Sequence, residues 1–436
     1  MASRVRAAMR RARSLTSARP HLPARLRSRR SRVLVFLGLL GPGLIAANAG
    51  NDAGGVATYS SVGAKYGYSL LWAMVLITVS LALVQRAAAR MGVITGKGLA
   101  ELIRERYGIR WSAFATTAVL IASVGICISD FVGVGAALGL AGIPVQVSVP
   151  IAAGCIWLII LRGSYRSAER IFIWLTIPFF AYPVAAILAH PDWGEVGHSL
   201  VVPQIQTSPA YLLLFVATAG TTITPYMQLY LQSAVVERGA GKDELKAESR
   251  EAVAGALFAN LIAAFIIIAT AATLYAGGVH TIGSAADAAK ALGPLAGQYA
   301  ELLFGIGLLG ASLLAAAILP IATAYVLSES LGFEKGVGRR AREAPVFMGV
   351  IAAMIALSTV VAVIPGIPVI ALLVGVQVVN GLLLPINLFF IWRLARNPEL
   401  MGEDRNRGAV DGLTAATVAV TSALSLVLVA VTVLGL

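Results

Sequence analysis

The stretch Leu44-Ile-Ala-Ala-Asn-Ala-Gly-Asn-Asp52-Ala-Gly-Gly-Val-Ala-Thr58 decides the fold of this chain. It places Asp52, the first acid of the sequence, inside an apolar run long enough to cross a bilayer. An Asp at the centre of a membrane helix costs roughly 2.5–3.5 kcal/mol on insertion scales. The neighbouring glycines let the helix open there and expose backbone carbonyls. The pattern predicts an ion site at an interrupted membrane helix, or, as the alternative, a carboxylate that only caps a half-helix.

The composition is that of a polytopic membrane protein. Of 436 residues, 58% are hydrophobic and 13% charged, whereas a soluble domain carries about 25% charged residues. The sequence offers no soluble basic domain, so we expect no nucleic-acid partner. The two cysteines, Cys127 and Cys155, lie in apolar stretches and predict neither a disulfide framework nor a cofactor site.

Apolar segments of membrane length recur along the whole chain. With about 20 residues needed for each span, they predict an all-α protein of about eleven transmembrane helices, at 33–63, 68–90, 111–139, 146–162, 169–189, 209–236, 250–277, 296–329, 345–364, 368–392 and 410–434.

The placement of Lys and Arg predicts the orientation. If the N-terminus is cytoplasmic, then only Lys65 and Lys290 of the 34 basic residues fall on the outer side. The positive-inside rule therefore indicates a multi-pass plasma (inner) membrane protein with a cytoplasmic N-terminus and an extracytoplasmic C-terminus. Residues 1–32 contain eleven Arg and no acid. They predict a disordered basic tail attracted to anionic lipid, or alternatively a targeting peptide.

A second interruption lies five spans after the first, at 220–228, where the sequence reads Gly-Thr-Thr-Ile-Thr-Pro-Tyr-Met-Gln. Because five is an odd number, the two halves have opposite topology. Paired broken helices in inverted repeats mark the substrate site of secondary transporters. We therefore expect a repeat of helices 1–5 at 33–190, a repeat of helices 6–10 at 209–393, and an accessory helix at 408–436.

The side chains and carbonyls at the two breaks suit a hard cation. Asp52 supplies a carboxylate, Thr224 a hydroxyl, and Thr221 and the region of Ala49 supply carbonyls. Oxygen ligands of this kind favour Mg²⁺, Ca²⁺ or Mn²⁺ over softer metals. Met227 lies near the second break and is interpreted as packing.

Two further polar residues inside predicted spans leave alternatives open. Asp130 is either a proton relay or a structural acid. Gln377 either reaches the ion or forms an interhelical hydrogen bond, and Asn380 is interpreted as the latter. All four histidines lie outside the spans, so no His-based proton switch is evident.

Gly41-Pro-Gly43 before the first break, and the loop from Gln85 to Lys97 followed by Leu99-Ala-Glu-Leu102, resemble the NRAMP family of divalent-metal transporters. The resemblance covers nearly the whole chain after the tail. It implies a LeuT-type fold with a 5+5 inverted repeat and an ion held by broken helices 1 and 6.

The departures from the family pattern indicate its magnesium-transporting branch. Gly55 stands where the family has a ligand Asn, Thr224 and Tyr226 stand where it has Met and His, and Gly133 replaces a Glu. Loss of the thioether removes an affinity gain that Mg²⁺ cannot share. Loss of two side-chain ligands predicts a roomier site for a partly hydrated ion.

The sequence thus predicts a monomeric importer of Mg²⁺, and also of Mn²⁺, without strict proton coupling. The site residues expected from the resemblance and from the breaks are Asp52, Gly55, Ala49, Thr221, Thr224, Tyr226 and Gln377, with Asp130 as a proton-carrying or structural acid. A proton-coupled Mn²⁺ or Fe²⁺ symporter, a LeuT-type amino-acid or organic-cation symporter, and a non-transporting sensor remain alternatives.

Overall fold

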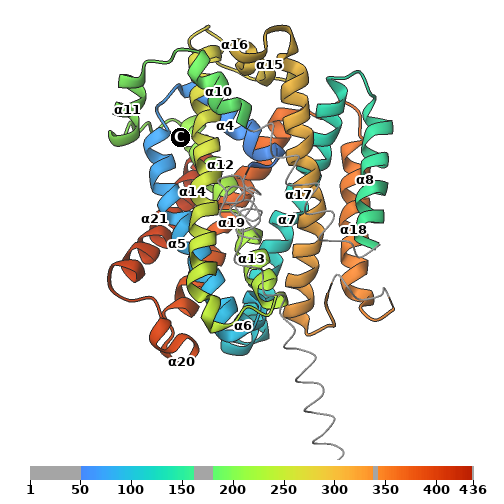
Figure 1. Cartoon of the computed structure of the whole chain (residues 1–436), viewed down its shortest axis with the longest axis vertical. Helices are drawn as coiled ribbons and strands as arrows, with labels where there is room; N and C mark the ends of the chain where they lie inside the picture. The colour runs from blue at the N-terminus through green and yellow to red at the C-terminus, as the bar shows by residue number, and fades with distance from the viewer. Residues whose placement is uncertain (1–50, 162–179, 337–341, 435–436) are drawn as a thin grey trace, which may run out of the picture. The chain divides into compact units, whose positions relative to one another are not determined.

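Long apolar helices make up most of the structure, a computed structural model that describes residues 51–161, 180–336 and 342–434 (Figure 1). These residues belong to one unit, 41–436. Within them, eight helical segments are long and apolar enough to cross a membrane, and each coincides with a predicted span. They are α5 (Leu71–Thr95), α7 (Ile109–Gly139), α12 with α13 (Pro209–Thr222 and Pro225–Glu237), α14 with η4 (Leu245–Thr270 and Ala271–Tyr275), α17 (Ala300–Leu331), α18 (Pro345–Ala362), α19 (Val369–Ala395) and α21 (Gly408–Leu434).

Three predicted spans are shorter or only partly described. The fourth corresponds to α8 (Val145–Leu161), an apolar helix of 17 residues. The first and fifth extend into residues outside the described ranges, and their described parts are α4 (Ala53–Tyr66) and α10 (Ala181–Leu188). The basic tail and Ala49 also lie outside the described residues. The division into repeats stays a prediction.

Short helices form at both ends of the long ones, in segments that lie between the predicted spans. The α6 end carries α6 (Leu99–Tyr107), η3 (Lys242–Glu244), α20 (Pro398–Met401) and η7 (Gly402–Asp404). The opposite end, called here the α15 end, carries α11 (Trp193–Val201), α15 (Ala285–Ala289), η5 (Lys290–Leu292), α16 (Gly293–Ala296) and η6 (Gly297–Tyr299).

Local capping explains why some of these loops are helical. The Asp192 carboxylate accepts hydrogen bonds from the Gly194 and Glu195 amides at the start of α11. Ser284 and Asp287 form a reciprocal capping box at the start of α15. Such caps stabilise a helix by about 0.5–2 kcal/mol. A prediction based on the length of apolar segments does not take caps into account, so it does not find these short helices.

The half-helix α4 lies in the middle of the bundle. It packs against α7, α12, α14 and α19, and Lys65 is its one exposed residue. A helix that is apolar all round is stable only when neighbours cover every face. Other helices therefore surround α4, which begins directly after Asp52.

Candidate ion site at the two helix breaks

Asp52 begins α4 and is 1% exposed. Its Oδ1 accepts a hydrogen bond of 2.6 Å from the Gly55 amide, so the carboxylate caps the half-helix. Gln377 Nε2 lies 3.2 Å from Oδ1 and 3.4 Å from Oδ2. A carboxylate offers about four lone-pair sites. Asp52 therefore caps α4, and the cap leaves it acceptor capacity for a cation; whether it also binds an ion stays a prediction.

Gln377 reaches Asp52 because residue 54 has no side chain. A Cβ on Gly54 would lie 2.2 Å from Gln377 Nε2. Asn380 Nδ2 donates to Gln377 Oε1 at 3.3 Å and to the Gly220 carbonyl at 2.6 Å. Gln377 therefore forms interhelical hydrogen bonds and also lies next to the candidate site. Its amide nitrogen faces Asp52, so the side chain must turn before its oxygen can bind an ion.

The second break lies between α12 and α13. Pro225 occupies the first turn of α13, where its missing N–H costs nothing. Thr224 Oγ1 donates its proton to the Thr221 carbonyl at 2.6 Å, so that hydroxyl oxygen can act only as an acceptor in this geometry. Asn387 Nδ2 binds the Pro225 carbonyl at 3.2 Å. The break therefore presents oxygen lone pairs held in fixed positions.

Asp130 on α7 is fully buried. Its carboxylate faces the backbone N–H of Ala53 at the start of α4 and has no side-chain hydrogen-bond partner within the described residues. It interacts electrostatically with Asp52. Tyr226, in the first turn of α13 and 1% exposed, interacts electrostatically with both acids. An ionised carboxylate is costly to bury unless it is paired. A cation between the two breaks would relieve this cost, and so would protonation of one of the two acids.

Gly133 lies one turn after Asp130 and is closely surrounded. A Cβ at this position would lie 2.4 Å from Ala53 Cβ and 2.5 Å from Ser312 Oγ. Neighbouring helices α4 and α17 thus fill the space that a longer side chain would need. The sequence lacks a Glu at position 133, and the packing around this position also leaves no room for one.

The described residues contain no cluster of three or more His, Cys, Asp and Glu side chains suited to a metal. Met227 is fully buried in the apolar core. An ion at the breaks therefore depends on few charged ligands, and carbonyls, hydroxyls or water must supply the remainder. Gly55 contributes its backbone N–H to Asp52 and offers no side-chain ligand.

Two polar contacts near the breaks were not predicted. Tyr59 OH and Thr222 Oγ1 lie 2.8 Å apart and join α4 to α12. Asn51 Nδ2 donates to the Ala259 carbonyl at 3.1 Å and joins the first break to α14. Their partners are 163 and 208 residues away in sequence, so no local pattern identifies them.

Apolar side chains cover the site toward the α15 end. A cavity of about 10 Å³ is lined by Val56, Phe304 and Leu373, among others, and this is about the space of one water molecule. In this conformation the space between α4, α17 and α19 is too small for a hydrated ion to pass from the site to the α15 end.

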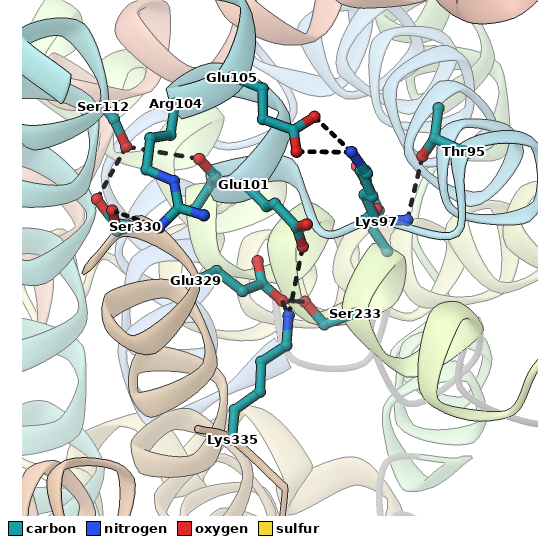
Figure 2. Close-up of polar contacts among 12 residues, drawn as sticks. Thr95, Lys97, Glu101, Arg104, Glu105, Ser112, Ser233, Glu329, Ser330 and Lys335 are labelled. Carbon is teal, nitrogen blue, oxygen red and sulfur yellow. Dashed lines mark hydrogen bonds and ion pairs between the residues drawn. The ribbon is translucent and has the colours of Figure 1, made fainter. Parts of the chain in front are cut away.

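At the α6 end, Glu329 joins several helices (Figure 2). Its side chain is 1% exposed, and Oε1 lies 2.9 Å from both Ser233 Oγ and Lys335 Nζ. Lys335 Nζ is also 3.7 Å from Glu101. A Cβ on Gly98 would lie 2.0 Å from Glu329 Oε2. We call Glu329, Ser233, Lys335, Glu101 and Gly98 the Glu329 cluster; it connects α6, α13 and α17.

A separate ion pair secures the loop before α6. Lys97 Nζ lies 2.6 Å from Glu105. This hydrogen-bonded contact raises the pKa of Lys97. The Lys97 carbonyl accepts a 2.9 Å hydrogen bond from Gln232 Nε2 on α13. The loop before α6 is thus held to α6 by the ion pair and to α13 by the hydrogen bond.

Comparisons with known proteins agree with this architecture. A model of the family described as "Natural resistance-associated macrophage protein-like" matches residues 43–431. The chain is 30% identical to a divalent metal cation transporter MntH of Yersinia pestis over 390 residues, 86% of this chain and 90% of that protein. It is also 30% identical to MntH of Deinococcus radiodurans over 313 residues, 69% of this chain and 70% of that one.

Solved structures show the same fold. A manganese transporter of Eremococcus coleocola, in complex with a bis-isothiourea compound, aligns with a TM-score of 0.72 and 20% identity, over 93% of this chain and 88% of that one. MhsT in complex with L-phenylalanine aligns with a TM-score of 0.58 and 15% identity, over 88% and 97%. The predicted all-α architecture, similar to these transporters, is confirmed.

Proposed function

Because the chain belongs to the natural resistance-associated macrophage protein-like (NRAMP) family of membrane metal transporters, we propose that it imports Mg²⁺, and also Mn²⁺, by alternating access. The observation that carries this proposal is the burial of two acids that interact electrostatically, Asp52 and Asp130, near a break whose other oxygens belong to hydroxyls and carbonyls. Mg²⁺ keeps several of its waters and is bound through one or two carboxylates. A partly hydrated ion fits such a donor set.

Each site residue has a proposed role. Asp52 attracts the ion, while Thr224, Thr221 and Ala49 hold its remaining shell, directly or through water. Tyr226 lines the second break, and the Gly55 amide orients Asp52. Gln377 turns toward the ion in one conformation only. The membrane potential contributes about 2.3 kcal/mol per charge per 100 mV, so a divalent ion gains about twice that on entry.

We propose that transport is not strictly coupled to protons. The family resemblance implies a Glu at position 133, and the loss of this titratable group implies weaker proton coupling; the packing around Gly133 leaves no space for such a side chain. Asp130 then acts as a second negative charge near the ion. The cytoplasmic N-terminus, the extracytoplasmic C-terminus, the two inverted repeats (33–190 and 209–393) and function as a monomer belong to the same proposal.

Proton-coupled Mn²⁺ or Fe²⁺ symport is the second candidate. It is favoured by the relatives, since MntH is named a divalent metal cation transporter and the Eremococcus protein a manganese transporter. An amino-acid symporter is disfavoured, because the carboxylate of Asp52 would repel a substrate carboxylate.

Liposome flux with an internal pH probe separates these functions. We expect Mg²⁺ to enter protein-containing liposomes under a negative-inside potential without acidification of the lumen. Mn²⁺ entry that acidifies the lumen, with neither entry nor competition by Mg²⁺, would contradict the proposal and support the second candidate. Uptake unchanged by Asp52→Asn would argue against this site.

A further inference from the structure

A basic cavity lies between α5 and α14 at the α6 end, apart from the helix breaks. Its volume is about 530 Å³. Four cations line it, Arg86 and Arg90 from α5 and Lys246 and Arg250 from α14, together with one acid, Asp404. The members of each pair are four residues apart on their helix, so each pair occupies one helix face.

Most of this positive charge is uncompensated. Arg90 Nη1 donates to Asn406 Oδ1 at 3.1 Å and interacts electrostatically with Asp404. Arg86, Lys246 and Arg250 form no ion pair with an acid of the described residues. The arginines of α5 are half-buried between the helices. Such an arrangement favours a ligand with several negative oxygens.

The wall of the cavity becomes apolar along α14. Val253 and Leu257 line it beyond the cations. Leu261 follows Leu257 one turn later on the same face of α14, and both leucines are 54% exposed. At 1.5 Å per residue, Leu257 lies about 10 Å along the helix from Arg250. The face thus changes from charged to apolar over about the distance between a lipid phosphate and its acyl chains.

We propose that this cavity binds the head group of an anionic phospholipid, with the phosphate between the cations of α5 and α14 and the acyl chains along Leu257 and Leu261. A free phosphate could bind the same cations, but it has no acyl chains to pack against the apolar wall. The lipid bridges α5, α14 and the segment after α20. This site is independent of the identity of the transported ion.

Lipid retention in native mass spectrometry tests the proposal. The full-length protein is given phosphatidylglycerol or phosphatidylcholine with the same acyl chains. We compare the wild type with Lys246→Gln/Arg250→Gln, which changes two exposed side chains of the cavity. The matched control is Arg393→Gln/Arg407→Gln, which removes equal charge from exposed residues at the same end, outside the cavity.

The wild type should retain phosphatidylglycerol in preference to phosphatidylcholine. Since each cation near a lipid head group contributes about 1 kcal/mol, the cavity variant should bind phosphatidylglycerol about 30-fold more weakly. The control should change by less than about threefold. An equal loss in the control would overturn the proposal in favour of general surface attraction.

Glycerophosphoglycerol and inorganic phosphate, neither of which has acyl chains, distinguish the two sources of the ligand. We expect neither to displace phosphatidylglycerol at millimolar concentration. Displacement by either one would overturn the lipid assignment and indicate a soluble anion. The thermal stability of both double variants in phosphatidylcholine checks that they are folded.

Discussion

Gln377 Nε2 lies 3.2 Å from Asp52 Oδ1, in space that a side chain at position 54 would occupy. The two residues are 325 positions apart, and they connect α19 to the first helix break. Gly54 is therefore a direct determinant of the geometry around the candidate ligand.

Gly54→Ala should displace Gln377, because the new Cβ would lie 2.2 Å from its Nε2. Loss of a hydrogen bond to a charged group costs about 1.5–3 kcal/mol. We expect about a tenfold or greater loss of Mg²⁺ uptake. The double variant Gly54→Ala/Gln377→Ala should recover thermal stability but not flux. Recovery of both would reduce Gln377 to a packing residue.

Asp52→Asn separates the two uses of this side chain. Asn remains a good N-cap, so the thermal stability of the protein should change little. Removal of the charge should lower Mg²⁺ affinity by more than the about 10–100-fold that loss of an outer-shell partner costs. Calorimetric titration with Mg²⁺ measures this. Asp192→Asn, at the exposed N-cap of α11, serves as the control and should bind normally.

Gly133→Glu should not create proton coupling. Its Cβ would meet Ala53 Cβ at 2.4 Å and Ser312 Oγ at 2.5 Å, and overpacking of this kind costs about 1–3 kcal/mol. Gly133→Ala should already lower the melting temperature. A stable Gly133→Glu protein that acidifies liposomes during uptake would show that the helices around this position can separate.

Gly55→Asn combined with Thr224→Met should move selectivity toward Mn²⁺. The thioether adds a ligand that favours Mn²⁺ and that Mg²⁺ cannot use. Competition between the two ions in the flux assay gives the ratio directly. Thr224→Val is the matched control, since it removes the hydroxyl without adding sulfur, and it should weaken both ions without reversing their order.

Glu329→Gln should weaken the Glu329 cluster. The substitution removes the charge that Lys335 contacts, and since Lys335 is 31% exposed, the loss should be near the lower end of about 1.5–3 kcal/mol. We expect a lower melting temperature and an altered maximal rate of uptake. Lys290→Gln, which breaks the exposed pair with Asp287 at the α15 end and leaves the cap of α15 in place, should leave both within error.

The sequence was sufficient for the long helices and for the break between α12 and α13. Span length located α5, α7 and α17, the Gly-rich stretch predicted a helix that begins at Asp52, and the Pro-containing interruption placed the break at Thr224. These features are local, since a span or a helix break is encoded within about 20 residues. The predicted ligand roles of Asp52, Thr221, Thr224, Tyr226 and Gln377 stay predictions that the experiments above address.

Contacts between distant residues could not be predicted in the same way. Tyr59 and Thr222, or Ser233 and Glu329, meet only after the helices have packed. The close approaches at Gly54 and Gly133 depend on which helix lies opposite, and a glycine alone does not reveal its neighbour. The amphipathic α6 and the capped α11 were missed because neither is long enough to count as a span.

Gly220 and Gly381 bring the backbones of α12 and α19 into direct contact. A Cβ on Gly220 would lie 2.3 Å from the Gln377 carbonyl, and a Cβ on Gly381 would lie 2.3 Å from the Val216 carbonyl. Any bulkier side chain at either glycine would push the two helices apart. A contact this close favours a joint movement of α12 and α19, in which the start of the second break and the backbone of Gln377 keep their spacing while the rest of the bundle shifts.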